Sequence, residues 1–417
     1  MKSANLTRNI LIGMVLGAAL GVVINMVGPA TPGFAWLVDG VFPVVGRIFV
    51  KSLQLLVVPL VLLSLICGTA SLNDVRRLGR IGLKTVAFYL ATTAIAVSTA
   101  IVLAVLIRPG DGLSLDYTAE FAVRESPPLT EVIMNVFPSN PFASMAEGNM
   151  LQIIVFAILF GVATCLAGEP GQRVLRLAND LNDIVMKLVM LLMQIAPFGV
   201  FALVARTFAA EGLPAILALG KYFFLVVGVL LVHLFVTYGL LFRVCTGLSV
   251  RTFMRKVRKV QLFAFSTASS NATLPLTLET VEHRLGVKPA VGAFTIPLGA
   301  TINMDGTAIL QGVATVFIAQ ALNVDIGVQG YLMVVLMATL SSIGTAGVPG
   351  VGLIMLAMVF QQVGLPVAAI GVIYGVDRLL DMVRTAVNVS GDCVVSVIVA
   401  KSEGEFDFDA FASVGDD

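Results

Sequence analysis

The feature that most constrains this chain is a series of long apolar runs in which charged residues are rare. A helix needs about 20 residues to cross the hydrocarbon core of a bilayer. Six such runs lie at 9–27, 44–70, 83–107, 150–167, 182–205 and 218–242. The chain has 417 residues, of which 58% are hydrophobic and 12% charged, whereas soluble domains carry about 25% charged residues. The sequence therefore predicts an all-α polytopic membrane protein.

Composition also limits the classes of function. The formal net charge is +1, whereas a nucleic-acid partner would require a concentrated basic surface. His233 and His283 are far apart in the sequence, and the four cysteines show no paired spacing, so we expect neither a metal centre nor a disulfide framework. The motifs HExxH and GxSxG and the P-loop do not occur in the sequence. We therefore expect no enzymatic activity, neither that of an intramembrane hydrolase nor that of an ATP-driven pump.

Basic residues in the short loops predict the orientation, because cytoplasmic loops carry an excess of Lys and Arg. They gather before the first run, between the second and third, after the fourth and after the sixth. These residues are Lys2, Arg8, Arg76, Arg77, Arg80, Lys84, Arg173, Arg176, Arg243, Arg251, Arg255, Lys256, Arg258 and Lys259. The pattern predicts a multi-pass protein of the cell inner (plasma) membrane with a cytoplasmic N-terminus, and the first run is expected to be a spanning helix that is not removed.

The next apolar stretch, 260–281, is predicted to form a re-entrant hairpin. Basic residues flank it on both sides, at 258–259 and at Arg284 and Lys288, and a hairpin that enters from the cytoplasm keeps both groups inside. Its middle, 266–275, is rich in Ser, Thr and Asn and ends in proline, which makes it a poor helix interior. Irregular backbone at membrane depth must be buried in protein or line a cavity, so this tip is expected to face the interior.

Three more apolar segments complete the predicted topology. The segment 289–322 crosses outward, and 328–363 is broken at 341–352 by Ser, Gly, Thr and Pro, which favours a second hairpin from the opposite face. The last helix, 368–400, returns to the cytoplasm, and the acidic tail 403–417 is expected to be solvated there. We thus expect eight transmembrane helices and two opposed hairpins, arranged as the inverted repeats common in secondary transporters.

The last helix carries the strongest functional signal. One stripe of this helix, less than a quarter-turn wide at 3.6 residues per turn, holds Asp377, Asp381, Arg384, Asn388 and Asp392. Each charge at the centre of a spanning helix costs about 2.5–3.5 kcal/mol when it faces lipid. The stripe must therefore face the protein interior, either as a structural ion-pair network or, more in keeping with intramembrane charges, as a binding site. Arg378 is expected to point off this stripe and to snorkel or pair elsewhere.

A second signal is AsnMetAspGlyThr at 303–307, inside an apolar segment. Asn and Gly there favour a local break that frees carbonyl oxygens, and Asp305 is a further intramembrane acid. Hard cations prefer carboxylate and carbonyl oxygens, although a packed glycine with a capped aspartate is the plain structural alternative. The hairpin tips add half-helix N-termini, which attract anions.

Four segments together resemble the dicarboxylate/amino acid:cation symporter family, which includes archaeal aspartate transporters and mammalian excitatory amino acid transporters. They are SerSerAsnAlaThrLeuPro (269–275), AsnMetAspGlyThr (303–307), GlyThrAlaGlyValProGly (344–350) and AspMetValArgThrAlaValAsnValSerGlyAsp (381–392). The resemblance covers nearly the whole chain. It implies a homotrimer in the membrane lipid, in which a transport domain slides against a fixed scaffold by an elevator mechanism.

The implied parts follow one another along the chain. They are scaffold helices at 1–70, the first transport-domain helix at 71–128, scaffold and trimerisation helices at 129–215, a transport-domain helix at 216–250, hairpin 1 at 251–286, an interrupted helix at 287–325, hairpin 2 at 326–365, the substrate-binding last helix at 366–402 and the tail at 403–417.

The resemblance also implies how an acidic amino acid substrate is bound. Arg384, helped by Thr307, would hold the side-chain carboxylate, since a bidentate guanidinium suits it. Asp381, with Thr385 nearby, would receive the α-amino group. The α-carboxylate would be held by Asn388, Ser269 and Ser270, and hairpin 2 would contribute Val348 and Gly352.

Several co-transported sodium ions are implied in the same way. One would bind Asp392, Asn388, Asn303 and the Gly299 carbonyl. Another would bind Asp305, Asn303, Tyr89, Thr92 and Thr93. A third would bind Thr301 with Ser342, Ile343 and Thr345.

The charge count agrees with cation coupling. Four intramembrane acids, Asp305, Asp377, Asp381 and Asp392, face one base, Arg384, and an acidic substrate adds further negative charge. The sequence thus predicts sodium-coupled uptake of L-aspartate or L-glutamate. A proton-coupled carrier or a C4-dicarboxylate carrier is the nearest alternative, although a carboxylate at Asp381 requires a cationic partner that an amine-free substrate lacks.

Overall fold

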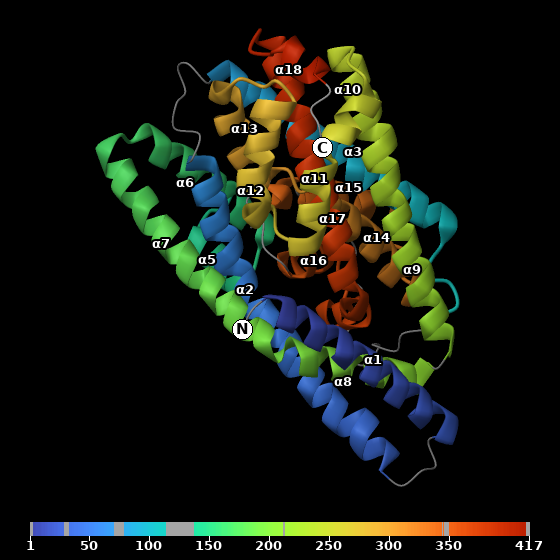
Figure 1. Cartoon of the computed structure of the whole chain (residues 1–417). Helices are drawn as coiled ribbons and strands as arrows, with labels where there is room; N and C mark the ends of the chain where they lie inside the picture. Colours follow the sequence, from blue (N-terminus) through green and yellow to red (C-terminus); the bar gives the residue numbers. More distant parts are fainter. Residues whose placement is uncertain are drawn as a thin grey trace.

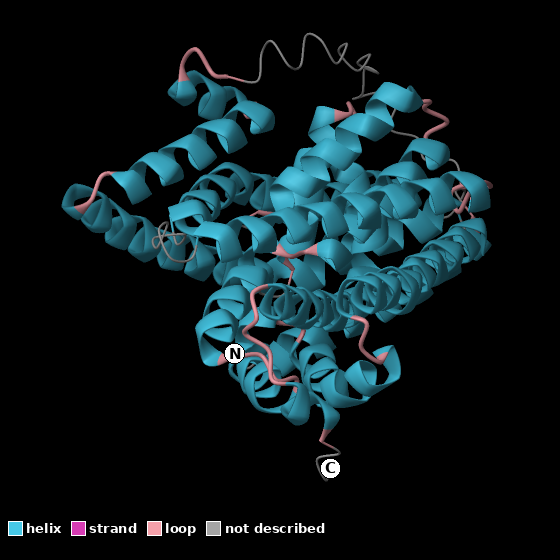
Figure 2. Ribbon diagram, turned by 90° about the horizontal axis from the view of Figure 1, so that it is seen from above, coloured by secondary structure: helices cyan, strands magenta, loops and turns pink. Residues whose placement is uncertain are grey.

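The computed structural model of the chain is almost entirely helical (Figure 1), and the residues that it describes contain no β-strand (Figure 2). It describes residues 3–28, 33–70, 79–113, 137–211, 213–343, 345 and 350–413. The one extended pairing within them is an isolated antiparallel bridge between Val287 and Phe406. The predicted all-α fold is confirmed.

One group of helices comes from the N-terminal half of the chain. It contains α1 (Ser3–Val27), the π-helical turn η1 (Trp36–Val41), α2 (Phe42–Ala70), α5 (Pro141–Glu147), α6 (Met150–Leu166), α7 (Glu169–Leu192), η2 (Met193–Ile195) and α8 (Ala196–Glu211). In Figure 1, α1 and α8 lie side by side at the lower end and α7 runs along the left flank. A Cβ on Gly13 or Gly17 of α1 would lie 2.5 or 2.6 Å from a carbonyl oxygen of α8. Small residues at a spacing of four thus let the two backbones approach closely.

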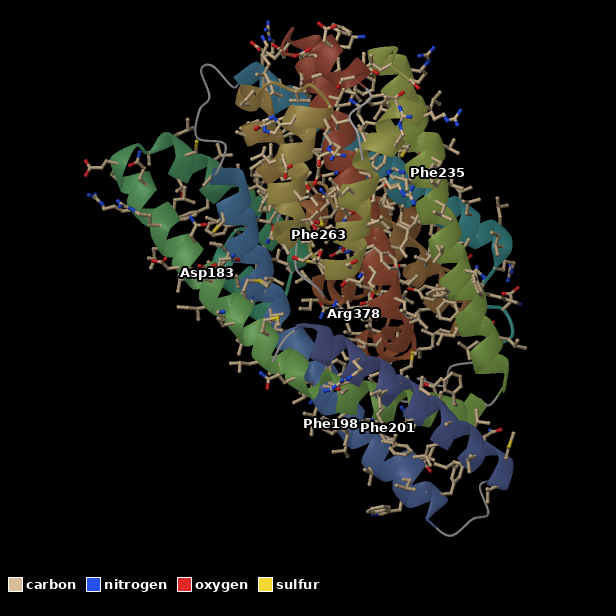
Figure 3. All side chains as sticks on the ribbon, viewed as in Figure 1. Asp183, Phe198, Phe201, Phe235, Phe263 and Arg378 are labelled. Carbon is tan, nitrogen blue, oxygen red and sulfur yellow. The ribbon has the colours of Figure 1, made fainter. Side chains whose placement is uncertain are left out.

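The run 182–205, predicted to form one spanning helix, is divided in the structure. The structure has two helices, α7 and α8, bent by 51° at the short turn between them. Pro197 lies just after this turn and lacks the N–H that would continue the helical hydrogen bonds. The first helix also begins earlier, at Glu169, and one face of it is charged, with Asp183 directed outward (Figure 3).

The second group forms the upper right of Figure 1. It begins with α3 (Gly79–Ile107) and with α9 (Leu213–Val232), which continues through η3 (His233–Thr237) into α10 (Tyr238–Thr246). The remaining elements are α11 (Val250–Thr267), α12 (Ser270–Glu279), η4 (Thr280–Arg284), α13 (Pro289–Ile302), α14 (Asp305–Ala321), α15 (Gly327–Ser342), α16 (Val351–Gln362), η5 (Val367–Ala369), α17 (Ile370–Ser402) and α18 (Phe408–Ala412). The long helix α17 runs through the middle of this group and packs on α3, α9, α11, α13 and α14.

The predicted breaks are present in this second group. Helices α11 and α12 form hairpin 1 and turn at Ala268, whose φ of 48° is left-handed, while the Ser269 side chain caps α12 by accepting a hydrogen bond from Ala272 N. The interrupted helix breaks between α13 and α14, at Asn303 and Met304. Helices α15 and α16 are the arms of hairpin 2, and most residues between them lie outside the described part of the chain.

Among the described residues, five helices are long and apolar enough to cross a membrane, or six if the bent pair α7 and α8 forms one span. Shorter apolar helical segments occur in α2, α6, α15 and α16. This is the pattern of a polytopic membrane protein with half-spanning hairpin arms, and the exact count of eight spans stays a prediction.

The prediction of a solvated tail holds only in part for residues 403–413, because six of these eleven residues are exposed and two, Phe406 and Phe411, are buried. Phe406 and Phe411 are 9% and 5% exposed, and Lys256 donates a hydrogen bond to the carbonyl of Ala410. Glu403 pairs with Arg80 and Lys84 of α3. Phe406 and Phe411 thus pack against the helices, and Glu403 and Glu405 pair with bases of other elements, whereas Asp407, Phe408 and Asp409 are exposed.

Candidate functional site

The charged stripe of α17 faces the protein interior, as predicted. Asp377, Asp381, Arg384, Asn388 and Asp392 are at most 8% exposed, and Arg384 is 1% exposed. An arginine with so little exposure must be paired, because an unpaired buried charge costs several kcal/mol. The stripe therefore forms the polar centre of the second helix group.

Arg384 pairs with two acids of its own helix. Its Nη2 donates to Asp381 Oδ1 at 2.8 Å, and its Nη1 lies 3.1 Å from Asp377 Oδ1 without hydrogen-bond geometry. Nη1 and Nε have no acceptor, although a guanidinium carries five N–H donors in a planar fork. These spare donors can bind a further carboxylate.

Hairpin 2 reaches this arginine through a glycine. A Cβ on Gly352 at the start of α16 would lie 2.9 Å from Arg384 Nη1. The absent side chain lets α16 pack directly on the guanidinium, and a role of Gly352 in substrate binding stays a prediction. Val348, predicted beside it, lies outside the described residues.

Asp381 has more partners than predicted. Arg378 Nη1 lies 3.3 Å from Asp381 Oδ2, and the Gly350 amide donates to the same oxygen at 3.3 Å. The expectation that Arg378 points away is therefore wrong: its long side chain bends back to an acid three residues later, and Figure 3 places it in the middle of the molecule. Thr385 is buried nearby, with its hydroxyl donated to the Asp381 carbonyl.

Asn388 joins α17 to the break in the interrupted helix. Its Oδ1 accepts a hydrogen bond from the Gly306 amide at 2.7 Å, at the first turn of α14. Thr307, the next residue, is buried. A Cβ on Gly306 would lie 2.9 Å from the Arg384 carbonyl oxygen. The break at 303–304 thus lies directly against the stripe. Ser269 and Ser270 at the tip of hairpin 1 are buried as well, and their part in substrate binding stays a prediction.

Two of the residues expected to bind the first cation, Asn303 and Gly299, lie against Asp392. Asn303 donates from Nδ2 to Asp392 Oδ1 at 2.8 Å and to the Asn388 carbonyl at 3.1 Å, and its buried Oδ1 has no hydrogen-bond partner. A Cβ on Gly299 would lie 2.4 Å from Asp392 Oδ1 and 2.6 Å from the Tyr89 hydroxyl. An orphaned amide oxygen beside a carboxylate fits a hard cation.

Asp305 is held differently. Its Oδ1 accepts the Thr93 hydroxyl at 2.5 Å, and its Oδ2 lies 2.7 Å from the Tyr238 hydroxyl and 2.9 Å from His233 Nε2. All four side chains are fully buried. Neither His233 nor Tyr238 was predicted to lie here; the signal for His233 was an ionisable side chain in the middle of an apolar run.

For the other predicted cation ligands, a role in binding sodium stays a prediction. Thr92 donates to the Tyr89 carbonyl. The hydroxyls of Thr301, Ser342 and Thr345 bond to carbonyls of their own segments, and Ile343 is buried. Among the described residues, no hydrogen bond joins Thr301 to hairpin 2.

Comparison with known proteins agrees with this geometry. The profile of the sodium:dicarboxylate symporter family matches residues 6–402. A proton/glutamate-aspartate symporter of Escherichia coli is 34% identical over 97% of this chain and 94% of its own length. A proton/sodium-glutamate symport protein of Geobacillus stearothermophilus is 31% identical over 97% and 96%. A C4-dicarboxylate transport protein of Rhodospirillum rubrum is 35% identical over 88% and 84%.

These matches span both helix groups and the whole buried stripe, and the names of the relatives are those of transporters. The predicted family is confirmed: this chain is a membrane protein of the sodium:dicarboxylate symporter family.

Proposed function

We propose that the protein takes up L-aspartate, L-glutamate or both together with sodium ions. The observation that carries this proposal is the buried pair on α17. Arg384 has two nitrogens without acceptors, and Asp381 lies beside it at 2.8 Å. One group attracts a carboxylate and the other attracts an amine, so the pair is complementary to an amino acid whose side chain is acidic.

In this proposal the substrate replaces contacts that α17 makes within itself. The side-chain carboxylate takes the Arg384 fork, and the α-amino group takes Asp381. The α-carboxylate is received by Asn388 and by Ser269 and Ser270 at the tip of hairpin 1. Smaller contacts come from Thr307, Thr385, Val348 and Gly352.

The relatives differ in the ion that their names give, so the cation must be argued from this chain. Four buried acids (Asp305, Asp377, Asp381 and Asp392) face the arginines Arg384 and Arg378, which leaves two negative charges in place of the three expected from the sequence. An acidic substrate adds one more, and charge is costly at membrane depth. Asp392 and the orphaned Asn303 oxygen supply the hard oxygen ligands that suit sodium.

The two helix groups suggest the proposed mechanism. The group around α17 contains both hairpins and every candidate ligand, whereas the group of α1, α2 and α8 contains none of them. We assign the group around α17 to a transport domain that moves across the membrane and the N-terminal group of α1, α2 and α8 to a scaffold. A homotrimer in the inner membrane, with both termini in the cytoplasm, accords with the basic residues of the predicted cytoplasmic loops and with exposed apolar side chains on α1 and α2 such as Val15, Val23 and Leu55.

Substrate class is tested by competition. Purified protein in liposomes, given a sodium gradient and radiolabelled L-aspartate, is challenged with unlabelled L-glutamate, succinate or L-asparagine. We expect L-glutamate or unlabelled L-aspartate to compete strongly, and succinate and L-asparagine to compete weakly. Stronger competition by succinate would instead favour a C4-dicarboxylate carrier, the activity named for the relative in Rhodospirillum rubrum.

A further inference from the structure

Helix α11, the first arm of hairpin 1, has one buried face and one exposed face. The buried face consists of Phe253, Val257, Val260 and Ala264, and the helix packs on α17. One base, Lys256, turns inward and donates hydrogen bonds to the carbonyls of Arg284 and Ala410. The helix contains no acid, so its exposed face has a positive charge that nothing on α11 offsets.

Four bases form the first part of this exposed face. They are Arg251, Arg255, Arg258 and Lys259, all exposed, and we call them the α11 bases. At 3.6 residues per turn and 1.5 Å per residue, the three arginines lie within about 60° on the helix surface, and all four bases lie within about 12 Å along the axis. Like charges so close together repel one another unless an anion lies among them.

Other bases at the same end of the domain are paired within the protein. Arg80 and Lys84 pair with Glu403, and Lys288 pairs with Glu405. In the described part of the chain, no ion pair or side-chain hydrogen bond joins the α11 bases to a partner. The tail acids thus neutralise the bases of α3 and α13 and leave those of α11 for an anion outside the chain.

Apolar side chains continue the exposed face further along the helix. Leu262 is 58% exposed and Phe265 is 41% exposed, and both lie within about 40° of Arg258 on the helix surface. Phe263, labelled in Figure 3, is 44% exposed beside them. Bases come first along α11 and apolar residues second, which is the order of a phospholipid from its headgroup to its acyl chains.

We propose that the exposed face of α11 binds an anionic phospholipid, whose headgroup lies among the α11 bases and whose acyl chains lie against Leu262 and Phe265. A guanidinium suits the oxygens of a phosphate, and a headgroup of net negative charge offsets four bases better than a zwitterionic headgroup does. The long side chains of Arg258 and Lys259 can extend back toward the headgroup from their deeper positions. This inference goes beyond the proposed function, because the lipid is bound whichever acid and cation the protein carries.

The test measures which lipid lies against Leu262. Trp36 is the one tryptophan of the chain, so Trp36→Phe removes the background fluorescence and Leu262→Trp supplies a single reporter. The full-length protein is reconstituted in liposomes of phosphatidylglycerol and phosphatidylcholine in which one lipid or the other is brominated on its acyl chains, since bromine quenches tryptophan that it contacts.

The expected result is a preference for phosphatidylglycerol at this reporter. The preference should be at least about 5-fold, which is the effect of one base near an anionic membrane surface. It should weaken as the salt concentration is raised, because salt screens exposed charges.

Val23→Trp in the same Trp36→Phe background is the matched reporter. Val23 is 54% exposed on α1, and no base occurs between Arg8 and Arg47 in the sequence. This reporter should therefore show little preference between the two lipids.

Removal of the charge tests the α11 bases directly. The substitutions Arg251→Gln, Arg255→Gln, Arg258→Gln and Lys259→Gln together should lower the preference at Leu262→Trp to that of Val23→Trp. Arg173→Gln with Arg176→Gln, at exposed positions of α7, is the control and should leave the preference unchanged.

Equal quenching by the two lipids at Leu262→Trp, or a preference that survives removal of the α11 bases, would overturn the inference. Quenching by neither lipid would show that water or protein covers this face, and would overturn it as well. If the variant without the α11 bases does not fold, the comparison of Leu262→Trp with Val23→Trp and the salt series still decide the matter.

Discussion

Arg384 Nη2 and Asp381 Oδ1 lie 2.8 Å apart on the same face of α17, three residues apart in sequence. Because this contact uses only part of the guanidinium, the same pair can hold itself together in the absence of substrate and still bind a second carboxylate. This relationship leads to the first two predictions.

Arg384→Ala is expected to weaken aspartate binding by at least about 30-fold, since removal of one partner of a buried charge pair costs about 2–5 kcal/mol. Binding is measured by isothermal titration of detergent-solubilised protein. Arg173→Ala is the control, because Arg173 lies on the exposed face of α7, where it pairs with Glu169. Unchanged aspartate affinity in folded Arg384→Ala would refute the proposed carboxylate contact.

Asp381→Asn tests the contact with the amine. The substitution removes the negative charge but keeps nearly the same shape, so L-aspartate should lose affinity by more than about 10-fold, whereas succinate, which has no amine, should not. Uptake competition in liposomes measures both. Equal losses for the two substrates would show that Asp381 does not recognise the amino group.

Gly299→Ala tests the space around Asp392. Its Cβ would lie 2.4 Å from Asp392 Oδ1, so the carboxylate must move, and the sodium concentration for half-maximal uptake should rise about 10-fold or more. Gly220→Ala on α9 is the matched control, since nothing lies within 4 Å of its Cβ and alanine favours a helix. A normal sodium dependence in Gly299→Ala would contradict a cation at Asp392.

The tail provides a prediction about pH. Hydrogen bonding, first from Lys84 and also from Arg80, lowers the pKa of Glu403 below its ordinary value of 4.5, although burial opposes this shift. Because the folded state holds this carboxyl ionised, its contribution to stability is complete above about pH 4.5 and is lost as the pH falls through the lowered pKa.

Glu403→Gln should therefore melt about 1–3 °C below wild type at pH 7, and the difference should shrink as the pH falls below 4. Thermal unfolding in detergent at several pH values measures this. Glu169→Gln serves as the control, because Glu169 belongs to an exposed pair within α7. A difference that persists at low pH would mean that Glu403 contributes through packing and not through charge.

The sequence predicted most of the stripe on α17 because helical periodicity and the cost of intramembrane charge both act along one helix. It predicted the break at Asn303 for a similar reason, since Asn and Gly disfavour a continuous helix locally. Two partners of Asp305, His233 and Tyr238, were missed because no pattern along the chain relates η3 and α10 to the break at 303–304. Arg378 was misplaced because its Cα lies off the charged stripe, whereas its long side chain reaches Asp381 on that stripe. The packed tail was missed because its aromatic residues stand among acids that look solvated.

The central claim is that a sodium gradient drives an acidic amino acid through this protein. The most direct measurement is accumulation of radiolabelled L-aspartate in liposomes under an inward sodium gradient, with the same pH on both sides and a proton ionophore present. We expect aspartate to accumulate above equilibrium, and Asp392→Asn to abolish the accumulation while Asp325→Asn, at an exposed loop position, leaves it intact. No accumulation under the sodium gradient, together with accumulation under an imposed proton gradient without the ionophore, would contradict the account.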